Sequence, residues 1–160
     1  MTSAIRVAAP DEAEALAALI NAAFLVERFF VEGDRTTAAG VRALLAKGTF
    51  LAADRDAALA ACVYVEPRGK RGYFGLLAVD PARKGTGLGR ALVTAAEDFL
   101  RERGCGAADI NVVDLRTELP PFYRRLGYAE TGTAPFPSDG RATRPCHFIL
   151  MSKPLTAVVR

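Results

Sequence analysis

The chain has little of what several large protein classes need. It contains no tryptophan, a single histidine and three cysteines in 160 residues. Cys62, Cys105 and Cys146 form no Cys-x-x-Cys pair, so neither a zinc site nor any other metal site is expected. All three lie in or beside apolar segments, and we interpret them as small buried side chains. This usage is typical of a reducing compartment, and a cytoplasmic location is therefore expected.

Long apolar runs and strong charge are also missing. The apolar stretch Leu16–Leu25 is too short to span a bilayer, and the acidic residues before it are unlike the start of a signal peptide. The formal net charge of +3 comes without a dense stripe of basic residues. We therefore expect neither a membrane nor a nucleic acid as a partner. A length of 160 residues with 51% hydrophobic side chains predicts one globular domain, residues 1–160.

The first third of the chain predicts a short strand and two helices. Ile5–Ala8 is a plausible edge strand. Asp11 and Glu14 have the spacing of a capping box, so they predict the start of the first helix. Thr36 or Thr37 predicts the cap of a second helix.

The middle of the chain predicts three central strands. Thr49–Ala53 and Ala57–Val65 are continuous apolar runs separated by an Asp-Arg-Asp turn, which is typical of a hairpin buried on both faces. Tyr73–Val79 follows as a third strand. No proline interrupts any of these runs, so each can lie inside a sheet.

A strand–helix–strand unit follows. Leu88 begins a helical hydrophobic period that continues to Leu100, and Gly104 supplies the C-terminal cap. The next strand, Ala107–Val113, should run parallel to Tyr73–Val79, because such crossovers are right-handed and join parallel strands.

The last third predicts a short helix and a closing hairpin. The helix should not begin before Pro120, because proline disfavours helical geometry in the residue before it. Strands over Tyr128–Thr133 and Cys146–Lys153 complete the chain. The predicted fold class is α/β (α+β): a mixed, mostly antiparallel sheet of six to seven strands with one parallel crossover and about four helices.

The most informative segment is the turn Lys84–Arg90, which joins a strand to the long helix. Its three glycines stand at alternate positions, so successive main-chain N–H groups can face an anion at the positive end of the helix dipole. Arg83, Lys84 and Arg90 add positive charge. A dinucleotide fingerprint would need glycine at position 90, and a P-loop would need Gly-Lys-Ser/Thr. The remaining alternative is a turn that only caps the helix.

Two motifs resemble the GNAT superfamily of N-acetyltransferases. Lys84-Gly85-Thr86-Gly87-Leu88-Gly89 is similar to the family pattern Gln/Arg-x-x-Gly-x-Gly/Ala, with Lys84 in place of the usual Gln or Arg. Tyr123-Arg124-Arg125-Leu126-Gly127-Tyr128 is similar to the family's Tyr-x-x-x-Gly-Phe/Tyr. Lysine keeps the positive charge but loses the bidentate fork of arginine.

The resemblance implies an acetyl-CoA-dependent enzyme without a metal. A main-chain N–H of Leu77 or Val79 would polarise the thioester, and Tyr123 would be the general acid that protonates the departing thiolate. The alternative for Tyr123 is a core tyrosine. The cofactor-binding residues implied are Leu77, Ala78, Val79, Lys84, Gly85, Thr86, Gly87, Leu88, Gly89 and Arg90.

The general base is not identified by the resemblance. Tyr73 occupies the strand position at which many relatives carry Glu. Glu66, Asp114 and Glu118 could reach the cleft, although each also fits a solvated surface carboxylate. Alternation along the strand puts His147 on the same apolar face as Ile149 and Met151. We interpret it as a hydrogen-bonded structural residue.

Acceptor contacts are expected from the segment Phe24–Arg35 and the loop Pro135–Pro145. The candidates are apolar side chains that could line a pocket or pin the loop, and arginines that could hold a carboxylate: Phe24, Phe29, Phe30, Arg35 and Arg116. The predicted function is acetyl transfer by direct attack of a primary amine, on a small molecule or a peptide N-terminus. A non-catalytic acyl-CoA sensor and a nucleotide-binding enzyme are the alternatives, the latter disfavoured by the glycine spacing. A homodimer is compatible with the sequence.

Overall fold

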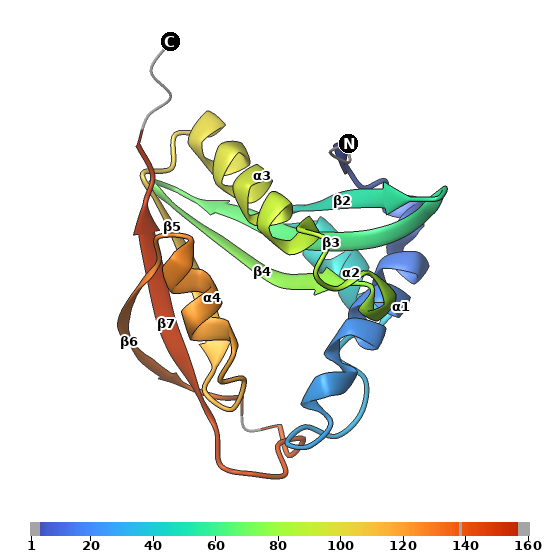
Figure 1. The fold of residues 1–160 in the computed structure, drawn as a ribbon, viewed down its shortest axis with the longest axis vertical. Coiled ribbons are helices and arrows are strands. Elements are labelled where there is room, and N and C mark those ends of the chain that lie inside the picture. The colour runs from blue at the N-terminus through green and yellow to red at the C-terminus, as the bar shows by residue number, and fades with distance from the viewer. Residues whose placement is uncertain (1–3, 138, 157–160) are drawn as a thin grey trace.

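The computed structural model of the chain describes residues 4–137 and 139–156. One seven-stranded sheet carries helices on both faces (Figure 1). Its strand order is β1-β2-β3-β4-β5-β7-β6. The strands are β1 (Ile5–Val7), β2 (Thr49–Arg55), β3 (Ala58–Arg68), β4 (Arg71–Val79), β5 (Ala107–Val113), β6 (Ala129–Pro135) and β7 (His147–Pro154). The helices are α1 (Ala13–Ala23), α2 (Ala38–Leu45), α3 (Leu88–Glu102) and α4 (Leu119–Arg125), with short 3-10 turns at Pro10–Glu12, Phe24–Glu27 and Pro81–Arg83.

The strands β4 and β5 form the parallel pair of an otherwise antiparallel sheet. They pair at three positions, from Arg71↔Ala107 to Tyr73↔Asp109. Beyond Tyr73 the two strands diverge, and the sheet opens into a V (Figure 1). The mixed sheet, the single crossover and the four helices confirm the predicted fold class.

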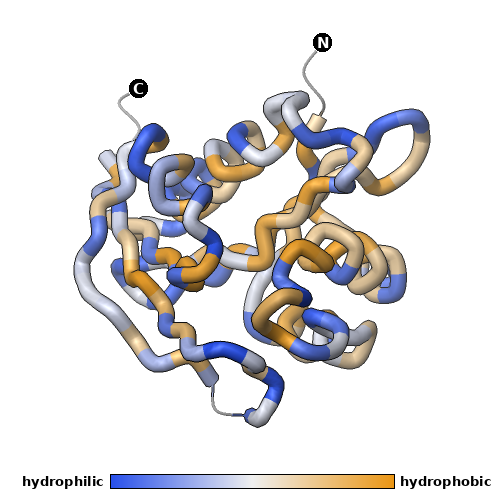
Figure 2. Tube along the Cα trace, turned by 60° about the horizontal axis from the view of Figure 1, so that its bottom comes forward, coloured by the Kyte–Doolittle hydropathy of each residue, from blue (hydrophilic) through white to orange (hydrophobic). Residues whose placement is uncertain are grey.

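Two apolar cores lie on opposite faces of the sheet. Phe74 and Leu92 belong to the core under α3 and α4, whereas Phe50 and Ile20 belong to the core under α1 and α2. Figure 2 shows hydrophilic residues gathered in the peripheral turns and hydrophobic residues along the inner strands. Each fully buried side chain of this size contributes about 1.5–3 kcal/mol. The two cores together hold the V of the sheet in place.

A β-bulge interrupts β4 at Leu76, where the backbone adopts φ 51°. The left-handed region costs a non-glycine residue about 1–2 kcal/mol, so the fold must hold this conformation in place. The extra residue changes the phase of the strand: Phe74 and Leu77 pack toward α3, while Tyr73 and Ala78 pack toward α1. Simple alternation along β4 therefore fails after residue 75.

The predicted helix starts need one correction and receive one confirmation. The acidic residue at the first cap is Glu12, whose carboxylate accepts from the Ala9 amide at 2.7 Å; no side-chain cap comes from Asp11. The reason is that Pro10 starts a 3-10 turn, which makes Glu12 its third residue. Thr37 caps α2 as predicted, since its hydroxyl accepts from the Gly40 amide at 3.0 Å.

Two further boundaries differ from the prediction. The β2–β3 turn is Asp56-Ala57, both with positive φ, so β2 continues through Arg55. Two consecutive residues with positive φ are typical of a two-residue hairpin turn, whereas the predicted three-residue turn would not need them. Helix α4 begins at Leu119 rather than Pro120, because prolines in a first turn replace amides that have no intrahelical acceptor.

Candidate active site

The turn between β4 and α3 exposes its main chain. Gly85 and Gly87 have φ of 80° and 82°, a conformation that glycine adopts without strain. The amides of residues 85–87 have no protein acceptor among the described residues, and the first amides of α3 have no intrahelical one. A Cβ at Gly85 or Gly87 would enter open space. This concave row of N–H groups, at the N-terminus of a 15-residue helix, fits a pyrophosphate.

The charges around the turn are not equivalent. Arg83 makes an ion pair with Asp56 at 2.9 Å, so its guanidinium is already engaged. Lys84 and Arg90 are exposed and form no ion pair within contact distance among the described residues, although the charge of Lys84 contributes to the lowered pKa of Glu118. These two cations are therefore the ones that an anion at the turn would meet.

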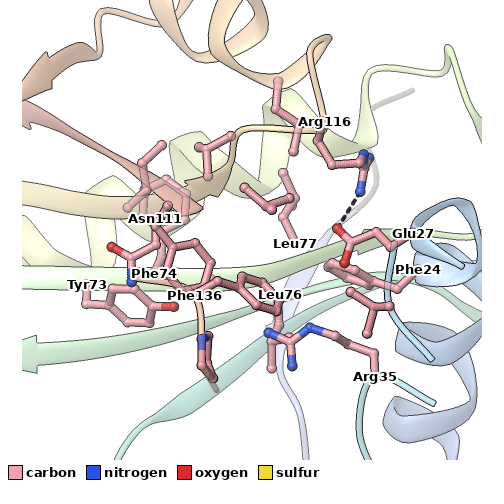
Figure 3. A pocket seen from close by; sticks show the side chains of 18 of the residues that line it. Phe24, Glu27, Arg35, Tyr73, Phe74, Leu76, Leu77, Asn111, Arg116 and Phe136 are labelled. Atoms are coloured by element: carbon pink, nitrogen blue, oxygen red, sulfur yellow. Dashed lines mark hydrogen bonds and ion pairs between the residues drawn. The ribbon is translucent and has the colours of Figure 1, made fainter. Parts of the chain in front are cut away.

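A cavity of about 220 Å³ fills the V between β4 and β5 (Figure 3). It adjoins the glycine turn, since Leu77 lines the cavity and its side chain lies 4.0 Å from the Cβ position of Gly89. Most of its wall is apolar. The aromatic part of the wall consists of Phe24, Tyr73, Phe74, Tyr123, Phe136 and Phe148.

Tyr123 is the tyrosine of the second motif, and it lines this cavity. Its ring packs on Phe74 and Tyr128, with centroids 6.3 and 5.8 Å away. No hydrogen-bond partner is seen for its hydroxyl among the described residues. Every fully buried side-chain polar atom of those residues has a partner, so the Tyr123 hydroxyl is not fully buried and reaches the cavity. Burial raises the pKa of Tyr123, which keeps the phenol protonated.

Glu27 is a cavity residue that the sequence did not reveal. Its side chain is buried in the wall, and Arg116 Nη1 donates to its Oε2 at 2.9 Å (Figure 3). Burial raises the pKa of Glu27, and the charge of Arg116 opposes that shift. The two residues are 89 positions apart, so no local pattern could have announced the contact.

The structure places three of the five predicted acceptor residues at the cavity. Phe24, Arg35 and Arg116 line it. Phe29 lies outside the lining with 47% of its surface exposed, and Phe30 is fully buried. The segment turns helically through Phe24–Glu27, so residues 24, 27 and 31 face the cavity while 29 and 30 point elsewhere.

The carboxylates proposed as bases do not line the cavity. Glu66 accepts from the Tyr64 hydroxyl at 2.7 Å and pairs with Arg68. Glu118 pairs with Arg116 at 3.0 Å and is not a lining residue. Asp114 accepts from the main chain of His147 at 2.9 Å. None of the three is therefore positioned as a direct base.

His147 and the cysteines only partly match their interpretation. The His147 side chain is about half exposed at the start of β7, so it does not share the buried face of its second neighbours. Its Nδ1 lies 3.5 Å from an oxygen of Asp114, and the hydrogen bond to that carboxylate comes from the main-chain amide of His147, so a hydrogen-bonded imidazole stays a prediction. Cys62 and Cys105 are buried as predicted, but Cys146, in the loop before β7, is only half-buried. Cys62 and Cys105 each belong to one of the two cores, whereas Cys146 belongs to neither.

The cavity mouth is crossed by two segments that are far apart in sequence. Val31 and Ala142 form an isolated bridge, and the Thr143 amide donates to the Phe30 carbonyl at 2.8 Å. Arg141 donates to the Glu32 carbonyl at 3.1 Å. We call this connection the strap. It joins the two predicted acceptor segments, Phe24–Arg35 and Pro135–Pro145; within the latter, Ser138 is outside the described residues.

Among the described residues, no group of three or more His, Cys, Asp or Glu side chains could hold a metal ion. None of the helices there has the length and apolar character that a membrane crossing requires.

A splayed mixed sheet, a glycine turn with free main-chain amides and an adjoining cavity fit the architecture of an acyltransferase. Residues 14–128 match the model of the Acetyltransferase (GNAT) family, and the chain belongs to this family. Streptothricin acetyltransferase of Streptomyces lavendulae is 35% identical over 108 residues, which are 66% of this chain and 57% of that protein. Mycothiol acetyltransferase of Clavibacter sepedonicus is 36% identical over 80 residues, 50% of this chain and 26% of that protein. The chain thus spans between a quarter and somewhat over half of these relatives.

Solved structures share the fold over nearly the whole chain. Nourseothricin acetyltransferase has a TM-score of 0.75 at 26% identity and covers 98% of this chain and 100% of its own. Ard1 from Thermoplasma volcanium has a TM-score of 0.80 at 18% identity, covering 98% and 99%. A structure of yncA from Salmonella typhimurium with its cofactor acetyl-CoA has a TM-score of 0.74 at 20% identity, covering 100% and 98%. The last two matches show the fold alone.

Proposed function

We propose that the chain is an N-acetyltransferase that moves an acetyl group from acetyl-CoA to a primary amine by direct attack in a ternary complex. The observation that carries this proposal is the glycine turn, with its free amides, opening beside the cavity that holds the Tyr123 hydroxyl. An anion site and an enclosed reaction space must adjoin if one cosubstrate is to occupy both.

The described residues fit acetyl-CoA. The amides from Lys84 through Arg90 would hold its pyrophosphate, with the cations of Lys84 and Arg90 beside them. The edge of β4 over Leu77–Val79 lies beyond the pairing with β5, so it can pair with an extended arm. When bound, acetyl-CoA supplies the acyl thioester. A main-chain N–H of Leu77 or Val79 donates to the thioester oxygen, where negative charge develops.

Tyr123 is proposed to donate its phenolic proton to the departing sulfur. Its raised pKa keeps this proton in place at neutral pH, and its hydroxyl faces the cavity. Tyr73, at the position of the family's strand glutamate, also has its pKa raised by burial and is a poor base. The acceptor proton therefore leaves through water or through a carboxylate from another element.

The relatives support a small-molecule acceptor rather than a peptide N-terminus. The proteins similar to this chain at 26–36% identity bear the names streptothricin, nourseothricin and mycothiol acetyltransferase. The free cysteines agree with action in the cytoplasm. One sheet with cores on both faces supports treating residues 1–160 as a single domain.

The test measures binding and chemistry separately. Calorimetry should show acetyl-CoA binding, and a panel of primary amines should release the CoA thiol only in the presence of the protein. Binding without thiol release from any amine would favour the sensor. Absence of acetyl-CoA binding would refute both.

A further inference from the structure

The charged groups of the cavity leave two positions open. Most of its charged side chains are engaged with other groups of the protein. Arg116 contacts both Glu27 and Glu118, and Arg141 uses its guanidinium on the carbonyls of Glu32 and Asp34. What remains among the charged lining groups is one oxygen of the buried Glu27 and the guanidinium of Arg35, an exposed residue that lines the cavity.

The open oxygen belongs to a carboxylate held in a fixed position. Arg116 contacts Oε2 of Glu27, while Oε1 has no donor among the described residues. Figure 3 shows this second oxygen pointing away from Arg116. Glu27 is 9% exposed, so little solvent compensates for a missing partner. An ammonium group would complete the carboxylate with a charge-assisted hydrogen bond.

The open cation is Arg35, which precedes α2. It lines the same cavity, and its guanidinium carbon lies 5.5 Å from the centre of the Phe24 ring. No hydrogen bond or ion pair within contact distance is seen for it among the described residues, in contrast to Arg116 and Arg141, although its charge acts at longer range to oppose the raised pKa of Glu27. A guanidinium in this position presents a fork that matches a carboxylate.

Resting on the proposed function, we propose that the acceptor is a small α-amino acid, whose ammonium contacts Glu27 Oε1 and whose carboxylate contacts Arg35. The pairing of one open carboxylate oxygen with one open guanidinium in a mostly apolar cavity carries this inference. A plain amine would leave Arg35 without a bound carboxylate, and a dicarboxylate would leave Glu27 Oε1 without a donor. The remaining charged lining residue, Asp139, is exposed next to the strap, and its carboxylate accepts from the Arg141 amide.

The test uses the whole chain with the twenty common α-amino acids and their primary amides as probes. Each amide keeps the amine and the side chain but lacks the carboxylate. Binding is measured as a thermal shift in the presence of CoA, and acetylation as release of the CoA thiol from acetyl-CoA. We expect the best acids to exceed their own amides about tenfold or more in kcat/KM, because a lost charge-assisted contact leaves Arg35 unpaired.

Substitutions assign each contact. Arg35→Gln should bring the acid-to-amide ratio close to one, whereas Arg144→Gln, which removes an exposed rim cation outside the cavity lining, should leave it unchanged. Glu27→Gln should weaken acids and amides alike. Glu118→Gln removes the other carboxylate on Arg116 and should preserve the activity of both probes.

Several results would overturn the proposal. Amides that match or exceed their acids would do so, as would an acid preference that survives Arg35→Gln. Acetyl-CoA binding together with turnover of plain amines but of no amino acid would refute the acceptor class and leave the proposed function intact. Failure to bind acetyl-CoA would refute the proposed function itself.

Discussion

The glycine turn and the acceptor cavity are neighbours built in different ways. The turn presents main-chain amides from seven consecutive residues, 84–90, of which every second one is a glycine without a side chain. The cavity consists of side chains from segments spread from Phe24 to Phe148. The first presents groups that every residue has, while the second depends on which residues the fold brings together.

Because of this difference, the two sites should tolerate different substitutions. A row of amides recognises one anion and tolerates few changes, since two positions need positive φ. A wall of side chains can be altered one residue at a time without disturbing the main chain. We therefore expect binding of the cosubstrate and choice of the acceptor to respond to different substitutions.

The largest effect should come from Gly89→Glu. Gly89 has ordinary helical geometry, and its Cβ would make normal contacts near 3.8 Å, so the new residue brings no backbone strain. An acid in the first turn of α3 favours the helix but repels a pyrophosphate. Acetyl-CoA affinity should fall by about 10²-fold or more, as measured by calorimetry, with an undiminished melting temperature.

Gly132→Glu on the exposed strand β6 is the matched control, because a Cβ there meets nothing within 4 Å. Unchanged acetyl-CoA affinity in Gly89→Glu would mean that the turn is only a helix cap.

The second largest effect concerns Tyr123, which lines the cavity and is proposed to protonate the departing thiolate of the cosubstrate. Tyr123→Phe should lower kcat by about 10²-fold with little change in acetyl-CoA affinity, because only a proton donor is lost. Tyr128→Phe is the control: its hydroxyl donates to Glu97 at 2.8 Å in the interior, so it should lower stability and spare kcat. Normal turnover in Tyr123→Phe would return Tyr123 to a purely structural role.

A third prediction addresses the short pairing of β4 with β5, which supports both the glycine turn and the cavity. Gly72 lies in the short parallel pairing of β4 with β5, and a Cβ there would collide with the side chain of Leu100 on α3. Gly72→Ala should lower the free energy of unfolding by about 1–3 kcal/mol through overpacking. Denaturant unfolding beside Gly132→Ala, which meets no neighbour, checks the change. Equal stability of both variants would show that Leu100 can move aside.

The smallest effect lies remote from both sites. Arg6 Nη2 donates to Glu12 Oε1 at 2.7 Å, and this contact lowers the pKa of Glu12 to about 2. A lowered carboxyl pKa stabilises the fold above the unfolded value near 4.5, and this contribution is lost as pH falls toward 2. Because Glu12 is partly exposed, we expect only about 1 kcal/mol. Denaturant unfolding at pH 7 and pH 3 should show a smaller loss in Glu12→Gln than in wild type.

Asp11→Asn serves as the control, since no ion pair is seen for Asp11. Acetyl transfer by Glu12→Gln should equal wild type. An unchanged acid dependence of stability in that variant would assign the effect to other carboxylates.

The sequence predicted what depends on local pattern. The period of α3, the glycines of the turn and the strand–helix–strand order are all local, and the structure has them where expected. The faces of β4 could not be predicted, because one extra residue at Leu76 reverses the alternation. Glu27 was missed for a related reason: an acid in an irregular segment looks solvated until the fold sets Arg116 against it.

The strap has a consequence for how an acceptor enters. It joins residues 30–34 to residues 141–143, and closing so long a loop costs conformational entropy with few hydrogen bonds in return. Such a connection opens at lower free energy than the central strands do. The glycine turn depends on residues 71–104 and has no bond to the strap among the described residues. We therefore expect the strap to open locally and admit an amine to the cavity while the cosubstrate stays bound at the glycine turn.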